Sequence, residues 1–150
     1  MIDAPFIPYQ TPHDLNRENQ IIEFLSTQWK FEYEKMGDYS IFDFRCWRNG
    51  KIIGFIEVKT KSKPYTDFDT YICTKTDIDH GLKLSNETKL PALLVVKWPD
   101  YFGYLDILHN QYESRKSGQR NRNDPRDYEA ICYLIPGVEF KEIKGFSFNE

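Results

Sequence analysis

The sequence contains little cysteine, and its cysteines do not form a recognisable pattern. Cys46, Cys73 and Cys132 lie far apart, and none of them belongs to a Cys-x-x-Cys pair. This spacing argues against both a disulfide framework and a zinc site. Each cysteine falls in an apolar, strand-like stretch, so we expect small buried core residues in a reducing cytoplasm.

Long hydrophobic runs and an excess of positive charge are also absent. No apolar run approaches the ~20 residues that a membrane-spanning helix needs. The segment 1–20 has no basic n-region and no apolar h-region, which predicts no secretory signal and a cytoplasmic protein without a membrane partner. The formal net charge of −3 is not typical of nucleic-acid binders, since phosphate contacts favour Lys and Arg. A protein of this composition that binds nucleic acid must concentrate its positive charge locally.

What the chain does contain predicts one globular domain over residues 1–150. Hydrophobic residues make up 40% of the sequence and aromatic residues 16%, enough for a real core. Helices are expected from Asp14 to about Lys30, and from Thr74 or Thr76 to about Lys89, before Pro91. Strands are expected over 31–36, 39–47, 51–60, 70–73, 92–97, 102–108, 129–135 and 138–143. This order predicts an α/β domain with a central mixed sheet flanked by helices: a core of about 14–108, a polar and basic loop at 109–127, and a closing pair of C-terminal strands at 128–144.

The pattern Glu-x-Lys occurs four times, beginning at Glu57, Glu87, Glu139 and Glu142. Residues two apart in a strand share a face, so Glu57 and Lys59 point the same way at the end of the most apolar strand. Glu87 lies on a predicted helix, where positions i and i+2 diverge. The last two pairs lie near the C-terminus with no helix after them. Asp127 precedes Glu139 at a plausible distance, however, so that pair remains open.

The partner of Glu57 and Lys59 would be Asp43, on the first strand of a predicted hairpin. A two-residue Asn49-Gly50 turn pairs position 43 with 56, which puts Asp43 and Glu57 on opposite faces. A three-residue turn that includes Arg48 pairs 43 with 55, which makes the two carboxylates diagonal neighbours on one face. A shared cation site therefore requires the three-residue turn or a local distortion.

One further carboxylate lies in an unusual place. The apolar stripe of the first helix is formed by Leu15, Ile22, Leu25 and Trp29, and Glu18 occupies the missing position of that series. Burying a carboxylate without a partner is costly. A side chain here could aim across the sheet at a cation bound by Asp43 and Glu57, or it could form a structural ion pair with Arg45 or Lys59.

Taken together, these features resemble the PD-(D/E)XK nuclease superfamily, and most of all the archaeal-type Holliday-junction resolvases. The resemblance runs from about residue 17 to residue 98, and it implies a restriction-endonuclease-like α-β-β-β-α-β core. The matching segments are RENQIIEFL, IFDF, RNGKIIGFIEVKTKS, YICTKTDIDHGLKLSNETKLP and ALLVVKW. Phe42 stands where the family usually has proline.

The resemblance implies a role for each candidate site residue. Asp43 and Glu57 would bind Mg²⁺ or Mn²⁺ with the Val58 carbonyl, Lys59 would position or activate the attacking water, and Glu18 would be an additional metal ligand. Hard carboxylate oxygens suit these cations. Lys75 matches the basic residue that opens the family's second helix, and Lys61 and Tyr71 are further candidates near the site.

The implied activity is that of a metal-dependent endodeoxyribonuclease that leaves 5′-phosphate and 3′-hydroxyl ends, with branched or otherwise structured DNA as a candidate substrate. The resemblance also implies a homodimer. The alternative is a catalytically silent module on the same fold that binds a protein or nucleic-acid partner, which the acidic composition favours.

Two charged segments allow a functional and a purely structural interpretation. The basic loop could contact DNA phosphates, or it could be a solvated loop tied down by Asp124 and Asp127. Its basic residues are Arg115, Lys116, Arg120, Arg122 and Arg126. Asp77, Asp79 and His80 are interpreted as a solvated helix face.

Overall fold

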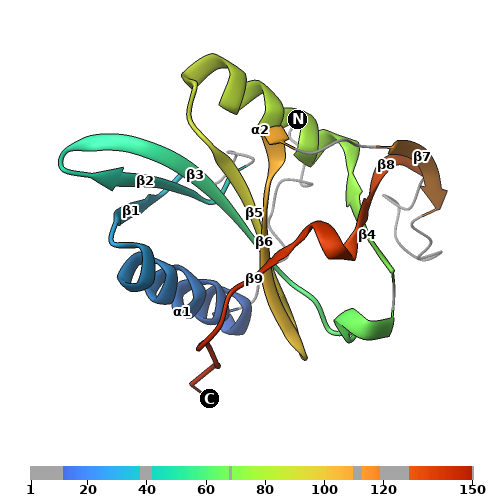
Figure 1. Cartoon of the computed structure of the whole chain (residues 1–150), viewed down its shortest axis with the longest axis horizontal. Helices are drawn as coiled ribbons and strands as arrows, with labels where there is room; N and C mark the ends of the chain where they lie inside the picture. The colour runs from blue at the N-terminus through green and yellow to red at the C-terminus, as the bar shows by residue number, and fades with distance from the viewer. Residues whose placement is uncertain (1–11, 38–41, 68, 110–112, 119–128, 150) are drawn as a thin grey trace.

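A computed structural model of the chain describes residues 12–37, 42–67, 69–109, 113–118 and 129–149, and shows a six-stranded mixed sheet covered on both faces (Figure 1). The large sheet has the order β1-β2-β3-β5-β6-β9; β3 and β5 run parallel and the other neighbours antiparallel. A second sheet has the order β4-β8-β7. The strands are β1 (Glu32–Lys35), β2 (Phe44–Arg48), β3 (Lys51–Thr60), β4 (Thr70–Thr74), β5 (Ala92–Trp98), β6 (Tyr101–Asp106), β7 (Glu113–Gly118), β8 (Glu129–Pro136) and β9 (Lys141–Glu142).

Two helices cover opposite faces of the large sheet. α1 (Pro12–Trp29) packs its buried residues Ile21, Ile22 and Leu25 against one face. α2 (Lys75–Thr88) packs Ile78 against the other face, together with the small sheet. Short 3₁₀ turns complete the fold: η2 (Tyr65–Asp67), η3 (Ile107–His109) and η4 (Gly137–Glu139). This confirms the predicted α/β domain with a central mixed sheet and its α-β-β-β-α-β core.

The N-terminal helix differs in detail from its prediction. It begins at Pro12, two residues before Asp14, because proline lacks an N–H that the first helical turn would leave unpaired in any case. Glu18 is buried on the predicted stripe, with 4% of its surface exposed. Leu15, predicted on the same stripe, is exposed instead.

The C-terminal third departs most from the sequence interpretation. The predicted loop at 109–127 contains strand β7, which pairs with β8, so the loop assignment is wrong over Glu113–Gly118. The strands predicted at 129–135 and 138–143 do not pair with each other: β8 joins β4 and β7, whereas β9 joins β6. The polar sequence of β7 did not indicate a strand, because a strand at the edge of a small sheet needs little hydrophobic surface.

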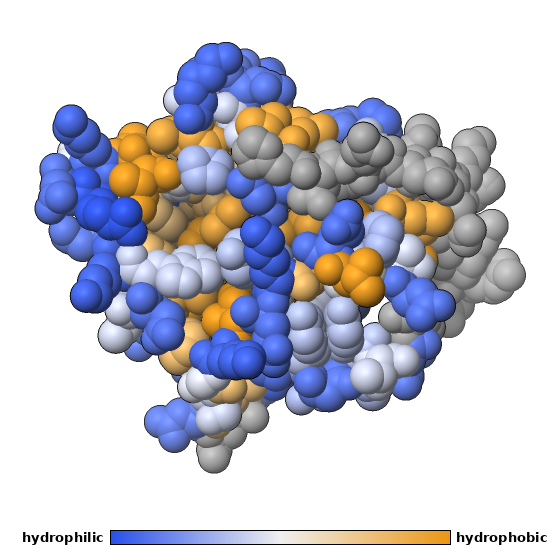
Figure 2. All heavy atoms as spheres, viewed as in Figure 1, coloured by the Kyte–Doolittle hydropathy of each residue, from blue (hydrophilic) through white to orange (hydrophobic). Residues whose placement is uncertain are grey.

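Hydrophobic side chains also reach the surface over the hairpin. Figure 2 shows them exposed at the left of the view, in the region that β2, β3 and β5 occupy in Figure 1. A groove of about 240 Å³ there is lined by Trp29, Phe31, Cys46, Arg48, Ile53, Gly54, Phe55, Ile56, Pro91 and Leu93.

The cysteines are buried and free, as predicted from their scattered positions. Within the described part of the chain, no helix is both long enough and apolar enough to cross a membrane.

Candidate active site

The β2–β3 hairpin brings Asp43 opposite Glu57 by a route that the sequence analysis named only as a local distortion. The turn is the two-residue Asn49-Gly50 type, with φ of 53° and 76°, so of the two expected alternatives the three-residue turn is excluded and the local distortion is found. The register then shifts between Trp47, which pairs with Ile52, and Cys46, which pairs with Gly54.

Ile53 is therefore an extra residue, a β-bulge in β3 that changes the register by one. Beyond the bulge Phe44 pairs with Ile56, so extending the register by one residue brings Asp43 opposite Glu57. Residues directly opposite each other in a sheet share a face, so the bulge achieves what the longer turn was expected to do.

Asp43 lies just outside β2, and there its side chain accepts a hydrogen bond from the backbone of β3. Its Oδ2 accepts a hydrogen bond from the Val58 amide at 2.8 Å, and its Oδ1 lies 3.7 Å from the Lys35 ammonium. Lys35 also forms an ion pair with Glu18. Glu18 thus reaches the site from α1, as expected, but it contacts a lysine that the sequence analysis did not single out.

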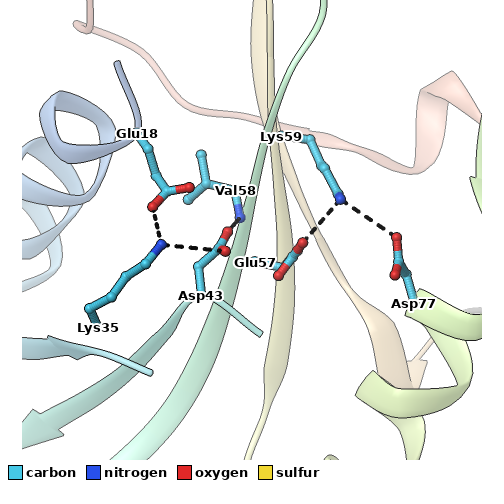
Figure 3. A network of polar contacts seen from close by, with 7 residues as sticks. All are labelled: Glu18, Lys35, Asp43, Glu57, Val58, Lys59 and Asp77. Atoms are coloured by element: carbon cyan, nitrogen blue, oxygen red, sulfur yellow. Dashed lines mark hydrogen bonds and ion pairs between the residues drawn. The ribbon is translucent and has the colours of Figure 1, made fainter. Parts of the chain in front are cut away.

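A second ion-pair group lies on the side of α2. The Lys59 ammonium is 3.1 Å from Glu57 Oε2 and 3.6 Å from Asp77 Oδ2. The interpretation of Asp77 as part of a solvated helix face is therefore wrong, because the first turn of α2 holds it against the end of β3. Figure 3 shows the two groups in one line, from Glu18 on α1 through Asp43 and Glu57 to Asp77 on α2.

Burial raises the pKa of both central carboxyl groups, Asp43 and Glu57. The pKa of Asp43 is raised to about 6 by burial and then by the negative charge of Glu18, against the opposing effects of the Val58 amide, Lys35 and Lys59. The pKa of Glu57 is raised to about 8 by burial and then by Asp43, against the opposing effect of Lys59. When both carboxyl groups are ionised, their negative charges repel each other. Positive charge nearby is therefore needed to stabilise the ionised pair.

The pKa values of the two lysines are raised as well, but by the neighbouring carboxylates and against the effect of burial. Burial alone would lower the pKa of Lys59, but Glu57 and Asp77 outweigh it and raise the pKa above its ordinary value. Burial likewise opposes the effect of Glu18 and Asp43 on Lys35, whose pKa is also raised. Both ammonium groups therefore remain charged at neutral pH.

The site fits a hard divalent cation in the chemistry of its donors. Glu57 Oε1 is buried and accepts no hydrogen bond from the residues that the structure describes, which is costly for a carboxylate oxygen. Asp43 and Glu57 supply oxygen donors of the kind that Mg²⁺ and Mn²⁺ prefer. Among the same residues, no three His, Cys, Asp or Glu side chains form a metal-binding group, in keeping with the pairing of Glu18 to Lys35.

The remaining predicted site residues, Lys75, Tyr71 and Lys61, have contacts of their own outside the two ion-pair groups. Lys75 pairs with Asp79, and its ammonium lies 5.9 Å from the ring centroid of Tyr133, on the α2–β8 side of the molecule. Tyr71 is buried, and burial raises its pKa, while the charge of Lys59 acts to lower it. The Lys61 ammonium lies 5.2 Å from the Tyr71 ring centroid.

The predicted DNA-binding loop is only partly covered by the structure. Arg120, Arg122 and Arg126 lie outside the described residues. Arg115 and Lys116 belong to β7, where their backbones pair with Cys132 and Ile131, and their side chains lie outside the description.

Comparison with known proteins agrees with this fold. Residues 7–143 match the sequence profile of a family described as "Phage putative PDDEXK endonuclease". The chain belongs to this PD-(D/E)XK family. A search of curated proteins finds no match. Among solved structures, the Holliday junction resolvase Hjc of Archaeoglobus fulgidus has the same fold, with a TM-score of 0.53 and 14% sequence identity over 84% of this chain and 90% of Hjc.

Lys35 and Asp77 are the residues of the site that the sequence analysis missed. Lys35 is the second-last residue of the strand predicted at 31–36, and a charged residue near a strand end usually faces solvent. Asp77 lies between Thr76 and Ile78 at the start of a helix, where an acidic residue is expected for the helix dipole alone. At neither position does the sequence pattern predict more than the face of the helix or strand on which the residue lies.

Proposed function

We propose that this protein is a divalent-metal-dependent endonuclease that hydrolyses DNA phosphodiester bonds, using Asp43, Glu57 and Lys59. The observation that supports this most is the buried Glu57 oxygen without a hydrogen-bond partner among the described residues, next to Asp43 and on the same face as Lys59. The ion pair with Lys59 involves only Glu57 Oε2, so it gives no structural role to the unpaired Oε1. Membership of a PD-(D/E)XK endonuclease family supports the same chemistry.

In this proposal Asp43 and Glu57 would hold Mg²⁺ or Mn²⁺, with the Val58 carbonyl as a further ligand. When bound, the cation supplies positive charge against the phosphate and lowers the pKa of a coordinated water. Lys59 orients the attacking water and donates hydrogen bonds to the phosphate oxygens as negative charge develops on them. Glu18 serves as an additional acidic residue once Lys35 moves away from it.

A cleavage assay with a matched carboxylate pair tests the proposal. Wild type, Glu57→Gln and Glu87→Gln are incubated with branched, double-stranded and single-stranded DNA, with Mg²⁺, Mn²⁺ or EDTA. Glu87 begins another Glu-x-Lys triplet on the exposed face of α2, so Glu87→Gln controls for the loss of one charge.

We expect metal-dependent cleavage by wild type and Glu87→Gln, and a loss of about 10²- to 10³-fold in Glu57→Gln. Folded wild-type protein that cleaves no DNA, or Glu57→Gln that cleaves as well as wild type, would refute the catalytic proposal. DNA binding without cleavage would support the non-catalytic module instead. Light scattering on the same sample tests the homodimer that the resemblance suggests.

A further inference from the structure

A cavity of about 390 Å³ opens directly beyond the end of β3, and the proposed function does not use it. Its position is between the segment that follows β3, the turn η2, strand β4 and the end of β5, which are seen together at the lower right of Figure 1. Its volume lies in the range of small-ligand sites. The lining residues are Thr60, Lys61, Ser62, Lys63, Tyr65, Thr70, Tyr71, Ile72, Trp98 and Gly137.

Aromatic side chains form the inner wall of this cavity and are held rigidly. Tyr65 stacks on Tyr101 with ring centroids 4.0 Å apart, and its hydroxyl donates a hydrogen bond to the Gly137 carbonyl at 2.7 Å. Trp98 packs edge-on against both Tyr65 and Tyr71, at 4.9 and 5.9 Å. A wall that is already fixed loses little entropy when a flat ligand binds to it.

The outer side combines positive charge with an exposed apolar residue. Lys61 and Lys63 are exposed, and neither forms an ion pair within the described part of the chain. Ile72 is 42% exposed although its neighbours on β4 are buried. Asp100, which contacts η2, already accepts hydrogen bonds from the Tyr65 amide and the Thr66 hydroxyl. An anionic ligand with an apolar face complements this lining.

The cavity begins at Thr60, the residue that follows the proposed catalytic lysine in the chain. The Lys61 amide donates a hydrogen bond to the Lys97 carbonyl at 2.8 Å, so the chain stays alongside β5 for one residue past the end of β3. Lys59 and Lys61 are therefore about 6.5–7 Å apart along an extended chain, comparable with the spacing of successive phosphates in a nucleic-acid strand. Tyr71 lines the cavity and also lies within the electrostatic influence of Lys59.

We propose that this cavity receives one unpaired nucleotide of the DNA strand beside the phosphate at the proposed site. The base lies against the aromatic wall and Ile72, and Lys61 and Lys63 contact the backbone phosphates. Nucleic-acid bases stack on aromatic side chains without sequence preference, whereas a paired base is not free to enter. The protein therefore prefers DNA with unpaired nucleotides at the cleavage position. This inference rests on the proposed function for the identity of its ligand.

Binding in the absence of metal separates this inference from catalysis. The probe is a short single-stranded oligonucleotide carrying one 2-aminopurine, measured by fluorescence in EDTA, with the same oligonucleotide in a full duplex as comparison. The variants are Ile72→Glu, which places a negative charge at the cavity without removing a buried side chain, and Lys63→Glu. Lys83→Glu, at an exposed position on α2, controls for the change in net charge.

We expect the single strand to change the 2-aminopurine signal and to bind more tightly than the duplex. Ile72→Glu and Lys63→Glu should each weaken this binding at least about fivefold, and Lys83→Glu much less. Equal binding of single strand and duplex, or equal losses in Lys63→Glu and Lys83→Glu, would overturn the inference. Because no cleavage occurs in EDTA, a protein that binds as expected but never cleaves would refute the proposed function and leave this inference standing.

Discussion

The two halves of the site have the same composition and different environments. On the α1 side Lys35 lies between Glu18 and Asp43, and on the α2 side Lys59 lies between Glu57 and Asp77. In the first half Asp43 also accepts a hydrogen bond from the Val58 amide. In the second half Glu57 keeps a buried oxygen that no described residue satisfies. Each half thus contains one lysine, one glutamate and one aspartate. The hydrogen bond from Val58 helps to compensate the charge of Asp43 in the first half, whereas Glu57 in the second half still requires a cation.

Exposure of the charged groups does not account for the difference. Lys35 ends β1, the edge strand of the large sheet, and Lys59 lies on β3 in the interior of the sheet. The two lysine side chains are similarly exposed, at 42% and 36%, and the glutamates that they contact are similarly buried, at 5% and 8%. The difference therefore lies in hydrogen bonding: Asp43 accepts a hydrogen bond from the Val58 amide, whereas Glu57 Oε1 accepts none from the described residues.

Replacing the lysine of the α2 half should have the largest effect. We expect Lys59→Ala to reduce metal-dependent DNA cleavage at least about 100-fold, because the phosphate loses the ammonium that stabilises its developing charge. Lys141→Ala, in another Glu-x-Lys triplet, should cleave as wild type does. Initial rates at saturating Mg²⁺ measure both. Equal rates for the two variants would show that the ammonium of Lys59 does not contribute to cleavage.

The pH dependence of stability should separate Glu57 from Asp43. Each carboxyl has a higher pKa in the folded protein than its ordinary value, so its stabilising contribution is complete at low pH and is lost as pH rises through the folded pKa. For Asp43 the loss falls between about 3.8 and 6, and for Glu57 between about 4.5 and 8. The metal-free protein should therefore become less stable as pH rises from about 4 to 8.

Melting temperatures in EDTA across this range check the assignment. Glu57→Gln should flatten the upper part of the curve, from about 6 to 8, and Asp43→Asn the lower part. Glu87→Gln should follow wild type. A wild-type melting temperature that rises between pH 6 and 8 would contradict the raised pKa of Glu57.

Removing the lysine of the α1 half should strengthen cation binding. In Lys35→Met, Glu18 and Asp43 lose the ammonium that competes with a cation, while an unbranched side chain still packs near the Phe44 ring, 5.0 Å from the ammonium in wild type. We expect Mn²⁺ to bind about 3- to 10-fold more tightly in calorimetric titration at low ionic strength. Lys51→Met, at an exposed position, is the control. Unchanged or weaker binding would indicate that Lys35 does not compete for the site.

The smallest effect is expected at the outer end of the α2 half. Asp77→Asn leaves Lys59 with Glu57 alone, and a partly exposed ion pair contributes little to stability, so we expect a two- to fivefold loss of cleavage with almost unchanged melting temperature. Asp79→Asn serves as control, because Asp79 pairs with Lys75 instead. Equal losses in both variants would show that Asp77 acts through α2 rather than through Lys59.

Much of the fold followed from local pattern. The helix with Glu18 on its stripe, the β2–β3 hairpin and the buried strand β5 are each marked by periodicity and turn residues within a short segment. β7 could not be found in this way, because its polar sequence resembles a loop and only pairing with β8 makes it a strand. The separation of β8 and β9 into different sheets likewise depends on partners distant in the sequence.

The sequence by itself determined the α/β order, the family resemblance and the candidate residues Glu18, Asp43, Glu57 and Lys59, because these depend on residue type and spacing. Only the tertiary structure decided how Asp43 meets Glu57: through a two-residue turn and a bulge at Ile53, whose register depends on packing across the sheet. It also decided which ammonium meets which carboxylate, since ion pairs between elements far apart in the chain leave no local pattern.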